Sequence, residues 1–302
     1  MATAAMVLPR DAIADAPAAA MTLGFSTYAM KAMSAADAIK TIAGLGFDSL
    51  ELCALVGFPT DPAKLEPVAR AALRKRIADS GLGLSAIMEN LPLQVDDKAH
   101  EAGLSRLRAA AEFGHALSPV SPPLIETVLG GSKWPDAKPL FLKRLADWAL
   151  LAEKQKVVIA IKPHRMNAVS TPAHAMGILH ELGNPAGLRM AYDFSHYADR
   201  ADMPDHSIAG TVRESLPMTA FVAVKDVETV EGKAVFRLPG ETGKTDNAAV
   251  VKALYAGGYR GDVNCEVSRA IWDKPNFDPI AAATTCYRNM DAAFEKAGVK
   301  RK

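Results

Sequence analysis

Short apolar runs alternate with amphipathic stretches along the chain from residue 23 onward. Eight of these runs have the length and bounding residues expected of strands. They are "LGFSTY" (23–28), "SLELCAL" (49–55), "LSAIMENL" (84–91), "PVSPPLIETV" (119–128), "VVIAIKPH" (157–164), "LRMAYDFSH" (188–196), "TAFVAVKD" (219–226) and "GDVNCEVS" (261–268). The stretches between them, such as 34–46, 66–81 and 143–155, are typical of helices. Several stretches end in glycine, the residue that commonly stops a helix: Gly46, Gly81, Gly183 and Gly257.

One strand and one helix recur at intervals of roughly 25 to 40 residues, which is the repeat of a (β/α)8 barrel. No linker or low-complexity segment interrupts the pattern, so we expect a single α/β domain, a TIM barrel, over residues 21–302. A doubly wound sheet is the alternative. No glycine-rich phosphate loop follows the first run, which argues against that fold and against a nucleotide cofactor.

Composition narrows the classes of function. The chain has 302 residues, of which 49% are hydrophobic and 23% charged, and its net charge of +1 gives no electrostatic reason to bind nucleic acid. No apolar run approaches the roughly 18 to 20 residues that cross a membrane. The three cysteines, Cys53, Cys265 and Cys286, lack the spacing of a thiolate zinc site. A small-molecule partner is therefore expected, and formation of a homo-oligomer stays open.

The first twenty residues differ from the rest in being rich in alanine. A short apolar run precedes Ala14-Asp15-Ala16, a pattern like that of an export-signal cleavage site, but there is no basic leader. Residues 1–20 are thus interpreted either as the remnant of an export signal or as a disordered tail. The first interpretation places the protein in the periplasm and the second in the cytoplasm.

Ionisable residues stand where the predicted strands end. In a barrel alternate strand residues point inward, and functional groups gather at the carboxyl ends of the strands. In the fifth run this alternation places Val158, Ala160 and Lys162 inside. Applied to the other runs, it adds Glu51, Glu89, Asp193, Lys225 and Glu266. Burial of so many charges is hard to justify by stability alone, because a buried ion pair at best offsets its desolvation cost.

The segments "YDFSHY", "VKD", "LPGETGKTD" and "CEVS", in this order on the last three runs, carry a family resemblance. The chain resembles the sugar phosphate isomerase/epimerase family of xylose-isomerase-like TIM barrels, which are related to the AP-endonuclease type. The resemblance implies one divalent metal held by a Glu on strand five, an Asp on strand six, a His on strand seven and a Glu on strand eight. It covers nearly the whole chain.

Only two of these four metal ligands are present. Asp193 and Glu266 match, whereas Lys162 takes the strand-five position and Ala223 the strand-seven position. A protonated lysine cannot bind a metal, but its ammonium can neutralise the carboxylates that a cation would balance. The alternative is a shifted Mn, Mg or Zn site in which His164 or His196 joins Asp193 and Glu266.

The expected reaction is proton transfer beside the carbonyl of a sugar or keto-sugar, through an enediolate. We expect Glu89 or Glu266 to move the proton and Lys162 to polarise the carbonyl or act as base. The predicted substrate contacts are Glu51, His164, His196, Lys225 and Trp134, the last as a platform for a sugar ring. The alternatives are a lyase that eliminates from 3-keto-glycosides and a non-catalytic sugar-binding barrel without its metal.

Overall fold

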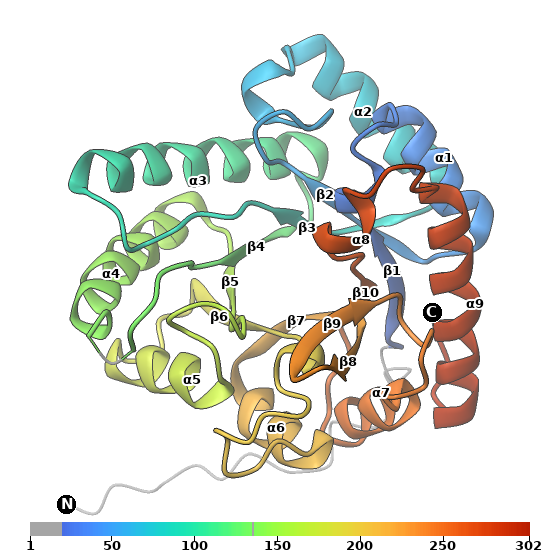
Figure 1. Cartoon of the computed structure of the whole chain (residues 1–302). Helices are drawn as coiled ribbons and strands as arrows, with labels where there is room; N and C mark the ends of the chain where they lie inside the picture. Colours follow the sequence, from blue (N-terminus) through green and yellow to red (C-terminus); the bar gives the residue numbers. More distant parts are fainter. Residues whose placement is uncertain (1–19, 135) are drawn as a thin grey trace, which may run out of the picture.

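Eight parallel strands close into a barrel in the computed structural model, which describes residues 20–134 and 136–302 (Figure 1). Around the barrel the order is β1-β10-β7-β6-β5-β4-β3-β2. The strands are β1 (Thr22–Ser26), β2 (Ser49–Cys53), β3 (Gly83–Met88), β4 (Leu124–Val128), β5 (Ile159–Lys162), β6 (Leu188–Tyr192), β7 (Thr219–Val224) and β10 (Asp262–Cys265). Each predicted run overlaps one of them, so the predicted (β/α)8 barrel is confirmed. The predicted export-signal remnant falls on residues 1–19, which lie outside the described residues.

Helices follow the strands and surround the barrel (Figure 1). They are α1 (Ala35–Leu45), α2 (Pro67–Ser80), α3 (Asp97–Leu117), α4 (Lys138–Gln155), α5 (Pro172–Glu181), α6 (Ile208–Ser215), α7 (Asn247–Ala256), α8 (Arg269–Trp272) and α9 (Pro279–Ala297). Single 3-10 turns lie at η1 (Thr27–Met30), η2 (Pro62–Lys64), η3 (Phe194–His196) and η4 (Leu216–Met218). The short α8 comes directly after β10, so it lies at the carboxyl-end mouth of the barrel.

The ends of α1 show how the sequence determines where these helices begin and end. Ser34 precedes it, and the Ser34 hydroxyl accepts a hydrogen bond from the Asp37 N–H. Gly46 ends the helix at φ 95°, where its N–H donates to the carbonyls of Ala43 and Ile42. Helix α7 stops at Gly257 as predicted, and the left-handed position there, φ 97°, belongs to the next residue, Gly258.

Two apolar layers explain where the polar groups stand. On β5, Ile159 and Ile161 join the large core between barrel and helices, together with Phe141 and Trp148 of α4. The intervening residue Ala160 joins a small cluster with side chains from other strands of the barrel, namely Ala86, Ala191, Phe221 and Ala223. Small side chains on the inner face leave room for the long ionisable side chains at the next inward positions.

The segment after β7 contains a hairpin of β8 (Asp226–Val230) and β9 (Lys233–Arg237) (Figure 1). Asp226 ties its base to the following segment: the carboxylate accepts hydrogen bonds from the Thr242 N–H, the Thr242 hydroxyl and the Asn247 side-chain amide. Strand β9 contacts α8. The hairpin therefore stands over the same end of the barrel as α8.

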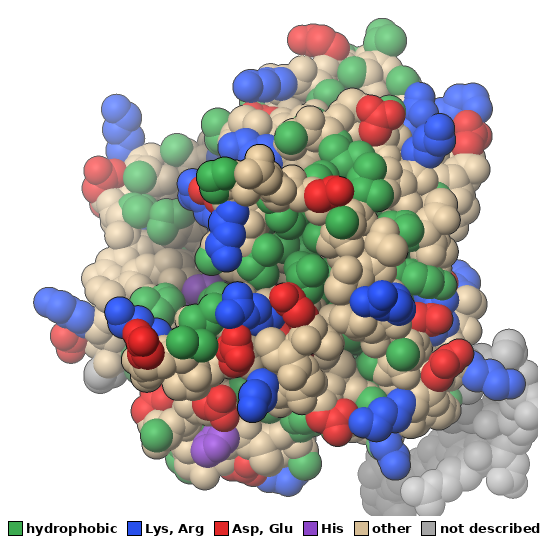
Figure 2. All heavy atoms as spheres, turned by 45° about the vertical axis from the view of Figure 1, so that its right-hand side comes forward, with side chains coloured by type: hydrophobic (Ala, Val, Ile, Leu, Met, Phe, Trp, Pro, Cys, Tyr) green, Lys and Arg blue, Asp and Glu red, His purple; other side chains and the backbone are tan. Residues whose placement is uncertain are grey.

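Figure 2 shows the face that carries the right-hand side of Figure 1. Acidic and basic side chains are interspersed over it, and hydrophobic side chains gather near its middle. None of the helices in the described part of the chain is long and apolar enough to span a membrane.

Candidate active site

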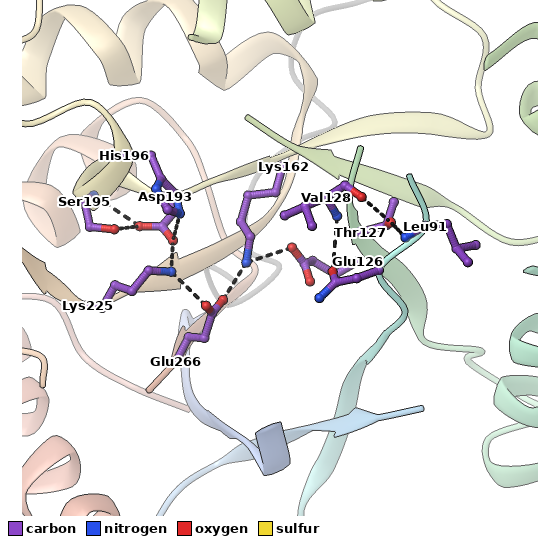
Figure 3. A network of polar contacts seen from close by, with 11 residues as sticks. Leu91, Glu126, Thr127, Val128, Lys162, Asp193, Ser195, His196, Lys225 and Glu266 are labelled. Atoms are coloured by element: carbon purple, nitrogen blue, oxygen red, sulfur yellow. Dashed lines mark hydrogen bonds and ion pairs between the residues drawn. The ribbon is translucent and has the colours of Figure 1, made fainter. Parts of the chain in front are cut away.

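Two lysines and three carboxylates form one chain of ion pairs at the carboxyl ends of the strands (Figure 3). Lys162 Nζ lies 2.5 Å from Glu266 Oε2 and 2.9 Å from Glu126 Oε1. Lys225 Nζ lies 2.5 Å from Asp193 Oδ2 and 2.8 Å from Glu266 Oε1. Glu266 therefore bridges the two ammonium groups. All five side chains are buried, so their charges depend on one another rather than on water.

This pairing sets the charge states of Lys162 and Glu266. Burial alone lowers the pKa of Lys162, but the carboxylates of Glu126, Glu266 and Asp193 outweigh burial and raise that pKa well above its ordinary value. Burial opposes ionisation of Glu266 as well, yet Lys162 and Lys225 lower its pKa to about 2. Lys162 is therefore a permanent cation at neutral pH, suited to stabilising negative charge and unsuited to removing a proton.

Two carboxyl groups are not neutralised in the same way: Glu126, at the end of the ion-pair chain, and Glu51, beside it. Burial, together with the neighbouring Glu126, raises the pKa of Glu51 to about 8. Burial also raises the pKa of Glu126, although Lys162 opposes the shift. Within the described residues, Glu51 Oε1 and Glu126 Oε2 have no hydrogen-bond partner. A pKa of about 8 favours the protonated form of Glu51 at neutral pH, and the raised pKa of Glu126 makes its carboxylate form a stronger base, a combination suited to proton transfer.

Two neutral imidazoles complete the site on the side of Asp193. The rings of His164 and His196 are 4.0 Å apart, and His196 Nε2 lies 3.4 Å from Asp193 Oδ2. Neither ring nitrogen of His196 has a hydrogen-bond partner among the described residues, although the side chain is fully buried. Burial lowers the pKa of His164 to about 4 and takes that of His196 well below its ordinary value. Phe236 of β9 covers this side, with its ring 5.3 Å from His196.

A family model described as a xylose isomerase-like TIM barrel matches residues 39–289. The chain belongs to this family. No curated protein matches the sequence. The match of the family model confirms the family resemblance that was inferred from four sequence segments.

Solved structures with the same barrel include several sugar epimerases. The apo form of 3-keto-D-glucoside 4-epimerase from E. coli has a TM-score of 0.69 and 15% identity, over 90% of this chain and 99% of that chain. L-ribulose 3-epimerase has a TM-score of 0.68 and 21% identity, over 92% and 97%. D-psicose 3-epimerase, solved in the presence of D-fructose, has a TM-score of 0.69 and 16% identity, over 92% and 100%. At these identities the likeness establishes the fold alone.

Of the predicted site residues, the structure brings Glu51, Lys162, His164, Asp193, His196, Lys225 and Glu266 to this mouth. Glu126, which sequence analysis missed, belongs with them. Its position on β4 carried a signal, because Glu126 is a charge in the middle of the apolar run "PPLIETV". A carboxylate there needs a buried partner, and Lys162 supplies it.

Glu89 does not join the network, and the prediction that it shares this cavity is wrong. Its carboxylate pairs with Arg106 of α3, which also lies 2.9 Å from Asp61. The reason is an extra residue in β3: Glu51 pairs with Ala86, although Leu50 pairs with Leu84, so the register shifts by one residue. Alternation counted through this bulge puts Glu89 inside, whereas Ala86 is the residue that faces inward.

Trp134, the expected ring platform, packs elsewhere. Its ring stacks on His174, with centroids 4.8 Å apart, and also contacts Phe141 of α4. An aromatic wall instead stands at the mouth, and we define it as Tyr28, Phe58 and Trp272. These residues come from the segments after β1, β2 and β10.

The aromatic wall is a compact cluster next to the ion-pair network. The Tyr28 ring lies 5.8 Å from Phe58 and 5.1 Å from Trp272. Lys31 Nζ lies 5.2 Å from the centre of the Phe58 ring. Burial raises the pKa of Tyr28 to about 12, with a smaller contribution from Glu266, which shows that the wall and the network are close. Aromatic faces of this kind suit the apolar faces of a sugar ring.

The donor set does not fit a divalent metal. Every oxygen of Asp193 and Glu266 is occupied: Asp193 Oδ1 accepts hydrogen bonds from the Ser195 N–H and hydroxyl, and ammonium groups take the other three. Ala223 faces the interior and offers no ligand. Within residues 20–134 and 136–302, no three His, Cys, Asp or Glu side chains are arranged to hold a metal.

Proposed function

We propose that the protein is a sugar or keto-sugar epimerase or isomerase that moves a proton beside a carbonyl group. The observation that carries the proposal is the pair of buried ammonium groups, Lys162 and Lys225, held by Glu266 at the barrel mouth. An enediolate places negative charge on the former carbonyl oxygen, and a fixed cation in a water-poor site stabilises such charge strongly. The sugar epimerases among the solved structures of this fold support the same chemistry.

In this proposal Glu126 removes the proton from the carbon next to the carbonyl. Its oxygen Oε2 has no hydrogen-bond partner in the described residues, and burial raises its pKa. The electrons form the enediolate, whose oxygen is paired with Lys162. Glu51, protonated at neutral pH, then returns a proton. Return to the opposite face of the same carbon gives the epimer. Return to the neighbouring carbon, with the hydroxyl proton of the enediolate moving to the former carbonyl oxygen, gives the isomer. Transfer of the proton from Glu126 to Glu51 restores the starting state.

Neutral and aromatic groups bind the rest of the substrate. His164 and His196 are neutral, so each can donate one hydrogen bond to a sugar hydroxyl and accept another. The aromatic wall supports the ring. The Phe236 ring of the β8–β9 hairpin lies 5.3 Å from the His196 ring and 5.7 Å from Lys225 Nζ, so in this proposal the hairpin moves to admit the substrate.

Hydrogen exchange tests the proposal directly. The protein is incubated in D2O with ketohexoses, 3-keto-glucose and 3-keto-glycosides, and mass spectrometry measures deuterium at the carbon beside the carbonyl. Exchange that Glu126→Gln abolishes is the expected result. Release of the aglycone from a 3-keto-glycoside would assign the lyase reaction instead. If the protein binds a sugar but gives neither exchange nor product, the enzymatic proposal is refuted, and a non-catalytic sugar-binding barrel is the remaining alternative.

A further inference from the structure

We infer that the ammonium groups of Lys162 and Lys225 supply the positive charge of this site, and that the site works without a divalent metal. The inference deepens the proposed function, since it concerns the cation that would stabilise the enediolate. Its main readout, metal binding, does not depend on any sugar being turned over.

The argument begins with the carboxylate oxygens. Lys225 Nζ lies between Asp193 Oδ2 and Glu266 Oε1, at 2.5 and 2.8 Å, which is the place a cation shared by these two strands would take. Lys162 Nζ lies at the second Glu266 oxygen, at 2.5 Å (Figure 3). A metal ion binding these carboxylates has to displace at least one ammonium group. The displaced ammonium would stay buried without a partner, which is strongly unfavourable.

Charge balance favours the same conclusion. With Glu126 ionised, Asp193, Glu266 and Glu126 carry three negative charges, and Lys162 and Lys225 carry two positive ones. Addition of a divalent cation would make the cluster net positive. If neither ammonium group were displaced, the metal and the two lysines would place three cationic centres around the carboxylate of Glu266. Like charges at such distances disfavour one another.

The competing hypothesis, for the described residues, is a metal site that includes His196. Its two nitrogens lack hydrogen-bond partners, and Nε2 lies 3.4 Å from Asp193 Oδ2. Imidazole and carboxylate together suit zinc or manganese. Such a site needs the oxygens of Asp193 and Glu266 that Lys225 occupies. Metal and Lys225 are therefore mutually exclusive, and removal of the ammonium should open the site.

The experiment measures binding of Zn²⁺ and Mn²⁺ to the full chain after EDTA treatment and dialysis, by calorimetry and by elemental analysis. We expect no saturable binding to the wild type up to about 1 mM metal. We expect Lys225→Met to bind one ion per chain with an affinity at least about tenfold higher. The gain should disappear in Lys225→Met/Asp193→Asn. Lys233→Met, which removes an exposed lysine of the hairpin, serves as the matched control.

Stoichiometric metal in the dialysed wild type, lost on Asp193→Asn, would overturn the inference. A folded Lys225→Met that gains no metal would overturn the assignment of Lys225 as the excluding cation. If Lys225→Met fails to fold, the wild-type titration still decides. Failure of every sugar to exchange in D2O would refute the proposed function and leave the metal titrations standing. Exchange that EDTA abolishes and Mn²⁺ restores would refute the metal-free site alone.

Discussion

Substitution of Lys162 by methionine separates a catalytic cation from a structural one. In the wild type three carboxylates share two ammonium groups; in Lys162→Met they share only that of Lys225, and Glu126 loses its cation. Removal of one partner of a buried ion pair costs about 3 to 5 kcal/mol. Domains are stable by about 5 to 15 kcal/mol, so we expect a folded but weakened protein.

The loss of stability should depend on pH in a defined direction. The lysines hold the folded-state pKa of Glu266 at about 2, below its ordinary value of 4.5. A carboxyl group with a lowered pKa stabilises the fold above its unfolded-state pKa, and this contribution is lost as the pH falls toward the folded-state value. The difference between wild type and Lys162→Met should therefore be complete at pH 7 and smaller at pH 4. Urea denaturation at both pH values measures it.

The catalytic role of Lys162 predicts a second, larger effect. Deuterium exchange per folded molecule should fall by about two to four orders of magnitude, the range for loss of an electrostatic or acid–base group. Lys162→Arg, which keeps the charge, should retain more exchange than Lys162→Met. Lys143→Met, on the exposed side of α4, should change neither quantity. Lower stability with normal exchange per folded molecule would show a structural ion pair only, and unchanged stability and exchange would refute both roles.

Three further substitutions test the other groups. Glu126→Gln should lower exchange by about two to four orders of magnitude, and an unchanged exchange rate would remove Glu126 as the base. Wild-type exchange should fall as the pH rises through about 8, because Glu51 then loses its proton; a pH profile of Glu51→Gln that keeps this decline would contradict the assignment. Trp272→Ala should raise KM roughly three- to tenfold with little change in kcat, and steady-state kinetics that show the reverse would place Trp272 in the chemistry.

The barrel was predictable because its signals are local. Alternation of apolar runs and amphipathic stretches marks each strand and helix, and residues such as Ser34 and Gly46 mark helix ends. The hairpin after β7 was not predictable in the same way. Its strands are half exposed and pack over the mouth, so their pattern lacks the continuous apolar run of a barrel strand.

Site residues were predictable where side chains alternate regularly between the inner and outer face of a strand. They were predicted wrongly where this alternation is interrupted. Lys162 and Asp193 each lie two residues beyond an inward alanine, Ala160 and Ala191, so counting by two finds them. In β3 the residue added at the bulge reverses the count, and Glu89 points away from the barrel interior. A bulge depends on how two strands twist against each other, and a single sequence does not show where one will occur.

In the proposed reaction, the role of each carboxylate depends on its ion-pair partners rather than on its place in the sequence. Glu89 or Glu266 was expected to move the proton, but two lysines lower the pKa of Glu266 and with it the basicity of this carboxylate. Among the described residues Glu126 forms an ion pair with Lys162 alone and has an oxygen without a hydrogen bond, which favours acceptance of a proton there. In the proposed reaction, the same lysine that lowers the basicity of Glu266 pairs with the substrate oxygen, while Glu126 acts on the carbon beside it. In this proposal, identical side chains at the ends of two separate strands, β4 and β10, have different functions because the cations are shared unequally between them.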